Sequence, residues 1–446
     1  MKFRLLVGII ATIGLATTAI AGTLFDPTRH MRVDEVRPGM TGYGLSVFSG
    51  TKIEKFDVVV VSVLRNYNPR RHVVLIRCSG QNLEHSGAVA GMSGSPLFLR
   101  DEQGKDRMIG AFAYGWELAK DPIAGVQPIE YMLELDGKPA QAAGARAQAR
   151  SPRQSWNVLT ATAGAWKGNP PDRQRDAAGL VPLAAPLMVA GISAPALERL
   201  KPLLDASGLT LFRGGGGGED DAVDPPIEPG SVIIAPLLTG DAAAYANGTC
   251  TEVIGDRVFA FGHPFNNEGQ ISLPMASGAV NAIVSSLQSS FKIATIGKTK
   301  GTFDTDEVVG IAGRFGEPPA QAPIDIRVTH ASGAQTAFRF SAVRHPRFLP
   351  MLGAIAVYAA ITGQSDLPQY HTIEYKLSLT FDNGRVVHIH NVDSNVDPMQ
   401  LVLSLASPIM AAAENPFERV LLKEMSGEVT IKSESRDAQI LAAQLP

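Results

Sequence analysis

Short runs of β-branched residues, separated by glycines and polar turns, recur along this chain and favour a mainly β fold. The clearest run is Asp57 to Leu64, which contains four consecutive valines. Similar strand signals occur at Leu45 to Phe48, Val73 to Arg77 and Met108 to Tyr114. Because β-branched and aromatic side chains suit a pleated sheet, this spacing predicts a small antiparallel barrel or sandwich in the first third of the chain.

Composition places the chain among soluble globular proteins. It has 446 residues, of which 45% are hydrophobic and 19% charged, enough for two to four domains. The formal net charge is -3, and the sequence contains no block of Lys and Arg. Since nucleic-acid binding normally requires clustered basic residues, we expect no DNA or RNA partner.

The N-terminus has the layout of a secretory signal peptide. Lys2 and Arg4 precede an apolar run from Leu5 to about Ile20, and Ala19-Ile20-Ala21 provides small residues at a cleavage site before Gly22. We therefore predict a signal peptide at residues 1–21 and an exported protein, either periplasmic or extracellular. The alternative is an uncleaved segment that associates with the membrane, because the apolar run is close to the shortest length that spans a bilayer.

The mature chain divides into four predicted regions. We expect a β-barrel half at 22–137, a linker and insertion at 138–228 that ends in an acidic glycine-rich loop, a second β-barrel half at 229–322, and a C-terminal β-rich, sandwich-like unit at 323–446. Within these regions the sequence predicts helices at Ala194–Leu204, Leu349–Thr362 and Met399–Ala413, a hairpin of Tyr375–Phe381 with Val386–Val392, and a late strand at Glu428–Lys432. The acidic loop lacks the Lys-Ser/Thr of a phosphate-binding loop.

The hexapeptide Gly91-Met92-Ser93-Gly94-Ser95-Pro96 holds a serine between small residues and is similar to the Gly-Asp-Ser-Gly-Gly-Pro loop of trypsin-type peptidases. Flanking glycines permit a sharp turn that brings amide groups near an attacked carbonyl. Ser93 is therefore the candidate nucleophile, and the N–H groups of Gly91 and Ser93 are candidate oxyanion donors. A tight turn between two strands, without chemistry, is the competing interpretation.

A nucleophilic serine needs a base, and His263 is the best candidate among nine histidines. It follows the apolar run Val258 to Phe261, where a strand ends in Gly-His-Pro, and the alternative is a structural histidine at a strand end. His388 and His390 share one face of a predicted strand, but without a third ligand a solvated polar face is the better interpretation, and we predict no metal or cofactor. Cys78 and Cys250, the two cysteines, are either one disulfide or two buried thiols.

Taken together, these residues resemble the sporulation factor IV B (SpoIVB) peptidase family, serine peptidases with a trypsin-like double β-barrel. The resemblance covers about half of the mature chain. It rests on two blocks: Ser86–Pro96 with Met108–Ala111, Asp121–Gly125 and Ile129–Leu133, and Gly248–Thr251 with Phe261–His263, Gly297–Gly301 and Gly310–Gly313.

The resemblance implies a serine endopeptidase with Ser93 as nucleophile and His263 as general base, acting on a protein or peptide. In the family the histidine half comes first, so the two halves are permuted here, and the PDZ domain that precedes the peptidase in sporulation members has no room ahead of Ser93. The family's acid upstream of the serine is also missing. Asp304 or Asp306 is expected to orient His263 instead, with Glu84 as another possibility and a Ser–His dyad as a third.

The alternative function is a non-catalytic scaffold or binding protein of the cell envelope that retains the peptidase fold. The missing acid favours it, while the presence of both Ser93 and His263 favours the enzyme. Substrate specificity and oligomeric state are left open by the sequence.

Overall fold

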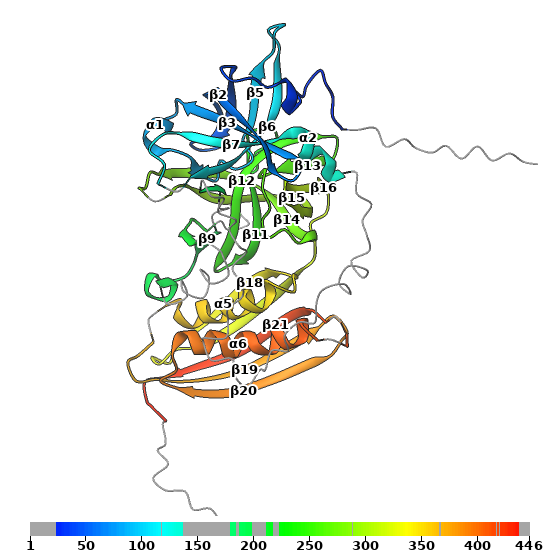
Figure 1. The fold of residues 1–446 in the computed structure, drawn as a ribbon. Helices are drawn as coiled ribbons and strands as arrows, with labels where there is room; N and C mark the ends of the chain where they lie inside the picture. Colours follow the sequence, from blue (N-terminus) through cyan, green and yellow to red (C-terminus); the bar gives the residue numbers. More distant parts are fainter. Residues whose placement is uncertain are drawn as a thin grey trace, which may run out of the picture.

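The computed structural model describes residues 24–116, 118–136, 179–183, 187–198, 211–216, 223–287, 289–364, 367–415, 417–418 and 420–436. The predicted signal peptide and most of the predicted linker lie outside these ranges. The protein is mainly β, as the sequence predicts, and contains a closed barrel of six strands and a second, larger sheet. In Figure 1 the barrel lies at the top, the second sheet passes through the middle, and two helices cover its lower part.

The barrel forms in the first third of the chain, where the β-branched runs predict it. Its order is β5-β1-β2-β3-β7-β6, and β5 closes the ring by pairing with β6. The strands are β1 (Thr41–Val47), β2 (Ile53–Asn68), β3 (Arg71–Ser79), β5 (Pro96–Arg100), β6 (Asp106–Trp116) and β7 (Ile123–Pro128), and β8 (Leu180–Pro182) adds to β6 outside the ring. Short helical turns η1 (Val33–Glu35), α1 (Leu83–Ser86), α2 (Ile129–Met132) and η2 (Leu133–Asp136) flank it.

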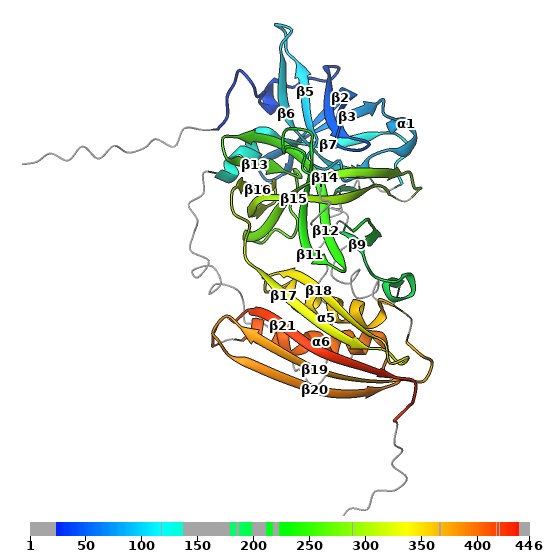
Figure 2. The same cartoon turned by 180° about the vertical axis from the view of Figure 1, so that it is seen from behind.

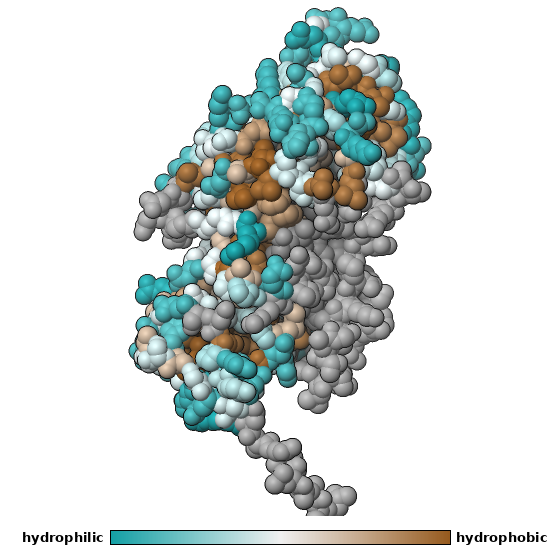
Figure 3. Space-filling view, turned by 90° about the vertical axis from the view of Figure 1, so that its left-hand side faces the viewer, coloured by the Kyte–Doolittle hydropathy of each residue, from teal (hydrophilic) through white to brown (hydrophobic). Residues whose placement is uncertain are grey.

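Alternation along β2 shows how the barrel fills its interior. Phe56, Val58 and Val60 are buried, whereas Val59 and Val61 are each 41% exposed. Successive side chains in a strand point to opposite faces, so one valine run supplies both a core face and an outer face. On the side drawn in Figure 3, exposed hydrophobic residues form separate brown patches among hydrophilic ones.

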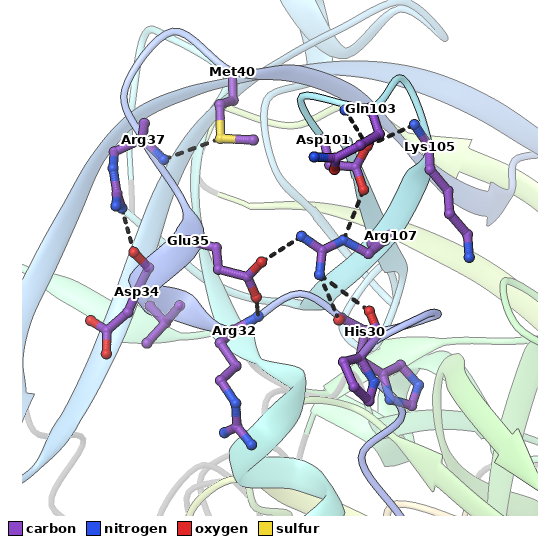
Figure 4. Close-up of polar contacts among 12 residues, drawn as sticks. His30, Arg32, Asp34, Glu35, Arg37, Met40, Asp101, Gln103, Lys105 and Arg107 are labelled. Carbon is purple, nitrogen blue, oxygen red and sulfur yellow. Dashed lines mark hydrogen bonds and ion pairs between the residues drawn. The ribbon is translucent and has the colours of Figure 1, made fainter.

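Arg107 on β6 fixes the segment that leads into the barrel (Figure 4). Its guanidinium group lies 2.5 Å from a carboxylate oxygen of Glu35 and 3.2 Å from one of Asp101, and it also donates to the carbonyl oxygen of His30. Asp101 in turn accepts from the N–H of Lys105 in the β5–β6 turn. One largely buried cation therefore ties the N-terminal segment to this hairpin.

The second sheet begins with six strands that pair in the order β12-β13-β16-β15-β14-β11, and β11 also pairs with β12. These are β11 (Val232–Gly240), β12 (Ala243–Ile254), β13 (Arg257–Ala260), β14 (Gly269–Val284), β15 (Ser290–Glu307) and β16 (Gly310–Phe315). Two short strands, β9 (Leu187–Ala190) and β10 (Leu211–Arg213), extend it from β12, and β4 (Val89–Ala90) leaves the barrel sequence to pair in parallel with β15. Residues 194–198 are helical, and the rest of the helix predicted there lies outside the described ranges.

The C-terminal part continues the second sheet through β18 (Gln335–Val343), β17 (Gln321–Thr329), β21 (Leu422–Lys432), β19 (Thr372–Phe381) and β20 (Val386–Ser394). The predicted hairpin is confirmed as β19 and β20, and the late strand as β21. The two predicted helices are also confirmed, as α5 (Leu349–Thr362) and α6 (Pro398–Ala413). Every residue of α5 is buried, since it packs against the sheet and against α6.

A β-sandwich-like unit, predicted for residues 323–446, is not confirmed. Helices α5 and α6 take the place of a second sheet on one face, and seen from behind, the strands lie in front of both helices (Figure 2). The physical reason is that two helix-forming apolar segments interrupt the strands, and together they bury the face that a second sheet would cover. The other face of β17, β18, β19 and β21 carries an open groove of about 850 Å³.

Candidate functional site

The Ser93 loop is a double turn between β4 and β5. The N–H of Met92 donates to the carbonyl oxygen of Val89 (3.0 Å), and the N–H of Ser95 donates to that of Met92 (2.8 Å). Gly91 and Gly94 have φ angles of 95° and 97°, in the left-handed region that glycine adopts most easily. A Cβ on Gly94 would lie 1.9 Å from the carbonyl oxygen of Thr249, so this position also has no room for a side chain.

One face of β12 holds the loop in place. The N–H of Thr249 donates to the carbonyl oxygen of Ser93 (2.8 Å), and its hydroxyl donates to that of Gly91 (3.0 Å). Thr251, two residues on and on the same strand face, donates its hydroxyl to the carbonyl oxygen of Gly94 (2.7 Å). Both threonines are buried, so the Gly248–Thr251 motif is the cradle of the serine loop.

His263 stands at a strained corner after β13. Phe261 and Gly262 both have positive φ angles, 66° and 69°, and this conformation is unusual for a bulky residue such as phenylalanine. The Phe261 ring fits there because residue 248 is glycine: a Cβ on Gly248 would lie 2.6 Å from the ring. Gly262 packs against Ala111 on β6, where its own Cβ would come within 2.8 Å of the alanine Cβ.

The two predicted segments adjoin, as the sequence analysis requires. A Cβ on Gly94 would lie 2.6 Å from the backbone nitrogen of Phe261, and the N–H of Gly94 donates to the carbonyl oxygen of Phe112, whose neighbour Ala111 faces Gly262. The serine loop and the histidine corner therefore meet on the same stretch of β6, although some 170 residues separate them in sequence.

Ser93 and His263 do not form a hydrogen bond in this structure. The Oγ atom of Ser93 and the Nε2 atom of His263 are both buried, and neither has a hydrogen-bond partner among the described residues. The residues are 0% and 2% exposed, so the site is closed to solvent. Met92 and Ser95 use their N–H groups in turn hydrogen bonds and Gly94 donates to Phe112 on β6, whereas no backbone hydrogen bond among the described residues uses the N–H of Gly91 or Ser93.

The imidazole of His263 is in the form that a general base requires. Its Nδ1 lies 2.9 Å from the carbonyl oxygen of Pro264, and because a carbonyl only accepts, Nδ1 carries the proton and Nε2 keeps its lone pair. Burial lowers the pKa of His263 to about 4, since the charged ring loses its hydration. At neutral pH the ring is uncharged and its free lone pair is on Nε2.

The expectation that Asp304 or Asp306 bonds to the His263 ring is wrong, because the Nδ1 of that ring is bonded to a backbone carbonyl instead. Asp304 is paired with Arg257 at 2.5 Å. Asp306 accepts from the N–H groups of Phe265 and Asn266, each at 2.7 Å, so it shapes the turn that follows His263 without contacting the imidazole. Burial raises the pKa of the Asp306 carboxyl against these backbone hydrogen bonds, which lower it.

Glu84, the third acid considered, is also occupied elsewhere. Its carboxylate accepts from the N–H of Gly80 and closes the turn that precedes α1. No carboxylate among those proposed from the sequence therefore orients His263, and the carbonyl of Pro264 fixes its tautomer.

Three amide side chains near the site also carry buried, unpartnered nitrogen atoms: Gln127, Asn247 and Asn266. For Asn247 both the Oδ1 and the Nδ2 atoms lack a partner among the described residues. Sequence reasoning missed Asn247, although a signal was present. It lies two residues before Thr249 in a strand and so shares the face that holds the serine loop.

A buried lysine, also missed from the sequence, lies beneath the loop. A Cβ on Gly91 would come within 3.3 Å of the Lys292 side chain, whose Nζ donates to Ser46 Oγ at 2.7 Å. Ser95 Oγ donates to the same oxygen at 3.0 Å and so connects the lysine to the loop. Burial lowers the pKa of Lys292 to about 7, because no carboxylate accompanies it among its hydrogen-bond partners in the described residues.

A second buried imidazole, that of His30, contacts a carboxylate. Its Nε2 lies 3.1 Å from Glu252, and its Nδ1 accepts from the N–H of Asp26, so Nε2 is the donor. Glu252 also pairs with Arg29 at 3.0 Å. This cluster joins the N-terminal segment to β12.

The remaining candidates have ordinary roles. His388 lies 3.0 Å from Ser378 Oγ, and His390 lies 3.1 Å from Glu374, both exposed on the C-terminal sheet. Within the described ranges no three His, Cys, Asp or Glu side chains group as metal ligands. Cys78 and Cys250 are free thiols, so the disulfide does not form, and each is buried in a different hydrophobic cluster.

No family model matches this chain, and no curated protein matches it. Among the residues that the structure describes, no helix combines the length and apolar character needed to cross a bilayer.

Proposed function

We propose that this protein is an exported serine endopeptidase in which Ser93 is the nucleophile and His263 the general base. The observation that carries the proposal is a pair of buried, unpartnered atoms, Ser93 Oγ and His263 Nε2, on segments that adjoin. Buried polar atoms are almost always hydrogen-bonded, so each exception calls for an explanation, and a catalytic role is one. The resemblance to the sporulation factor IV B peptidases agrees with both assignments.

The strand pairing supports a double-barrel interpretation. Six strands of the second sheet pair in a circuit that returns from β11 to β12, beside the closed barrel of the first third. We propose that this circuit is the second barrel half, with the halves in the reverse of the family's order. Catalytic groups recur in several chain orders when they meet in space, so the permutation is compatible with acyl transfer.

In the proposed reaction, Nε2 of His263 takes the proton of Ser93 as Oγ forms a bond to the peptide carbonyl carbon. The N–H groups of Gly91 and Ser93 donate to the oxyanion, and the tetrahedral intermediate breaks its C–N bond as Nε2 returns the proton to the leaving amine. Water then attacks the acyl carbonyl while Nε2 takes a proton from the water. The second intermediate breaks its bond to Ser93 Oγ as Nε2 returns the proton to that oxygen. Because Ser93 is fully buried, the loop has to open before a substrate enters.

Labelling with a fluorophosphonate probe tests the proposal. The wild type should be labelled, with the adduct on Ser93 by peptide mass spectrometry, and both Ser93→Ala and His263→Ala should lose labelling. Ser95→Ala is the matched control, since this buried serine belongs to the same loop and should leave the adduct on Ser93. Equal labelling of the wild type and Ser93→Ala contradicts the proposal.

A second candidate, a scaffold or binding protein of the cell envelope, is favoured by two observations. No carboxylate proposed from the sequence contacts His263, and the open face of the C-terminal sheet has a groove lined by charged side chains, among them Arg327, Arg339, Lys376 and Glu428. For this function the wild type should remain unlabelled by the probe at every pH, while Ser93→Ala retains the wild-type thermal stability.

A further inference from the structure

Asn247 is the residue near the serine loop whose chemistry the proposed mechanism does not yet use. It is 1% exposed, and neither atom of its amide group has a hydrogen-bond partner within the described part of the chain. Leaving two such atoms unpaired in a protein interior is unfavourable, so an unpartnered buried amide calls for an explanation. Its position on β12 supplies one.

The side chain faces the loop directly. A Cβ on Gly91 would lie 2.9 Å from Asn247 Nδ2, closer than two non-bonded atoms allow. Thr249, on the same strand face, holds the carbonyl oxygens of Gly91 and Ser93. Strand β12 therefore places an amide donor beside the first of the two residues whose N–H groups are the candidate oxyanion donors.

The other two unpartnered amides lie farther along the histidine side. Gln127 packs near Gly262, where a glycine Cβ would lie 3.6 Å from the Gln127 Cβ, and its Oε1 accepts from the hydroxyl of Tyr114. The backbone of Asn266 is held by Asp306, in the turn after His263. Of the three, Asn247 is the one whose amide nitrogen lies next to Gly91.

We propose that Asn247 Nδ2 donates a hydrogen bond to the oxyanion that forms when Ser93 attacks a carbonyl, as a third donor beside the N–H groups of Gly91 and Ser93. The proposal rests on the proposed function and deepens it. A side-chain amide suits this role because it is neutral, has no competing partner and stabilises charge that appears only in the transition state. Gly91 is then required twice, for its backbone angle and for the space in which the amide lies.

The test measures the second-order rate of phosphonylation of Ser93 by the fluorophosphonate probe, together with the melting temperature, in Asn247→Leu. Removing one oxyanion donor lowers turnover about 10²- to 10³-fold, and we expect a fall of this order in the phosphonylation rate. The melting temperature should stay the same or rise, because the substitution removes two unpaired buried polar atoms. If Asn247 were purely structural, Asn247→Leu would lower the melting temperature and leave the phosphonylation rate unchanged.

Two further variants sharpen the experiment. Asn247→Asp keeps the shape of the side chain without the amide donor, and its phosphonylation rate should also be low. Thr251→Val, on the same face of β12, breaks a hydrogen bond to the carbonyl of Gly94 and should lower the melting temperature, because its role is to hold the loop.

The two ways of failing are distinguishable. If the wild type is labelled on Ser93 and Asn247→Leu is labelled at the same rate, the role of Asn247 is refuted while the proposed function stands. If the wild type is not labelled at all, the proposed function is refuted, and the role of Asn247 with it. A lower melting temperature with an unchanged rate in Asn247→Asp identifies a structural residue and also overturns the inference.

Discussion

Lys292 gives the fold a pH dependence whose sign and size follow from its surroundings. The amine is buried, its described hydrogen bond is to Ser46 Oγ, and its pKa falls from an ordinary value of 10.5 to about 7. A lowered pKa means that the folded state favours the neutral amine, while the unfolded chain binds a proton up to pH 10.5. Between these values the unfolded state holds more protons, so the free energy of unfolding rises with pH.

The size of the effect follows from the same difference. One pKa unit corresponds to about 1.4 kcal/mol, so the contribution of Lys292 rises by about 1.4 kcal/mol per pH unit and by about 5 kcal/mol from pH 7 to pH 10.5. Below pH 7 the amine is protonated in both states, and the slope vanishes. Other titrating groups add their own slopes. Burial raises the pKa of Cys78 to about 12, for example, which lowers stability once unfolded thiols ionise.

Urea denaturation followed by circular dichroism at pH 7, 8, 9 and 10 measures this contribution. Subtracting the free energy of unfolding of Lys292→Met from that of the wild type cancels the pH dependence of all other groups. This difference in free energy of unfolding should grow in favour of the wild type as pH rises. Lys298→Met is the matched control: this lysine lies on the same strand, is 58% exposed in its side chain and should give a difference that does not change with pH. A flat difference for Lys292→Met as well would refute the reasoning and show that the amine is charged in the fold.

Two other predictions concern the site. Gly94→Ala places a Cβ 1.9 Å from the carbonyl oxygen of Thr249 at a φ of 97°. It should therefore destabilise the protein by about 3 kcal/mol or more and abolish probe labelling. Gly104→Ala is the control, because this glycine has a φ of 80° but open space around it, and it should shift the melting temperature far less. The labelling rate of the wild type should be constant above about pH 5 and fall below the His263 pKa of about 4, because only the neutral ring accepts the serine proton; a rate that falls already near pH 6.5 would mean that the imidazole is solvated in the reactive state.

Local pattern was sufficient for much of the fold. The valine run in β2 alternates between core and surface, and the apolar segment that became α5 is buried along its whole length. What the pattern did not reveal was what covers each face. The C-terminal strands have a buried side that is compatible with a second sheet or with helices, and only the packing of α5 and α6 decides between them.

For the site, the sequence identified the two segments that meet and missed how their polar groups are used. Ser93 and His263 could be proposed because glycine-rich turns and strand ends have sequence signals. The hydrogen-bond partner of His263 could not be predicted, because a backbone carbonyl has no sequence signal. Asp304 forms an ion pair with Arg257 instead. The burial of Lys292 could not be predicted, because it depends on β15 lying beneath a loop some 200 residues earlier in the chain.

The cradle formed by Thr249 and Thr251 has a consequence for how the molecule can be built. The hydrogen bonds from Thr249 and Thr251 to the serine loop are non-covalent and join two distant parts of the chain, so the order of these parts along the polypeptide does not affect the geometry between them. Two polypeptides, divided at one point between residues 137 and 178, should recombine into the same assembly when expressed together. A gene rearrangement that reverses the order of the two parts would leave the contacts between them unchanged.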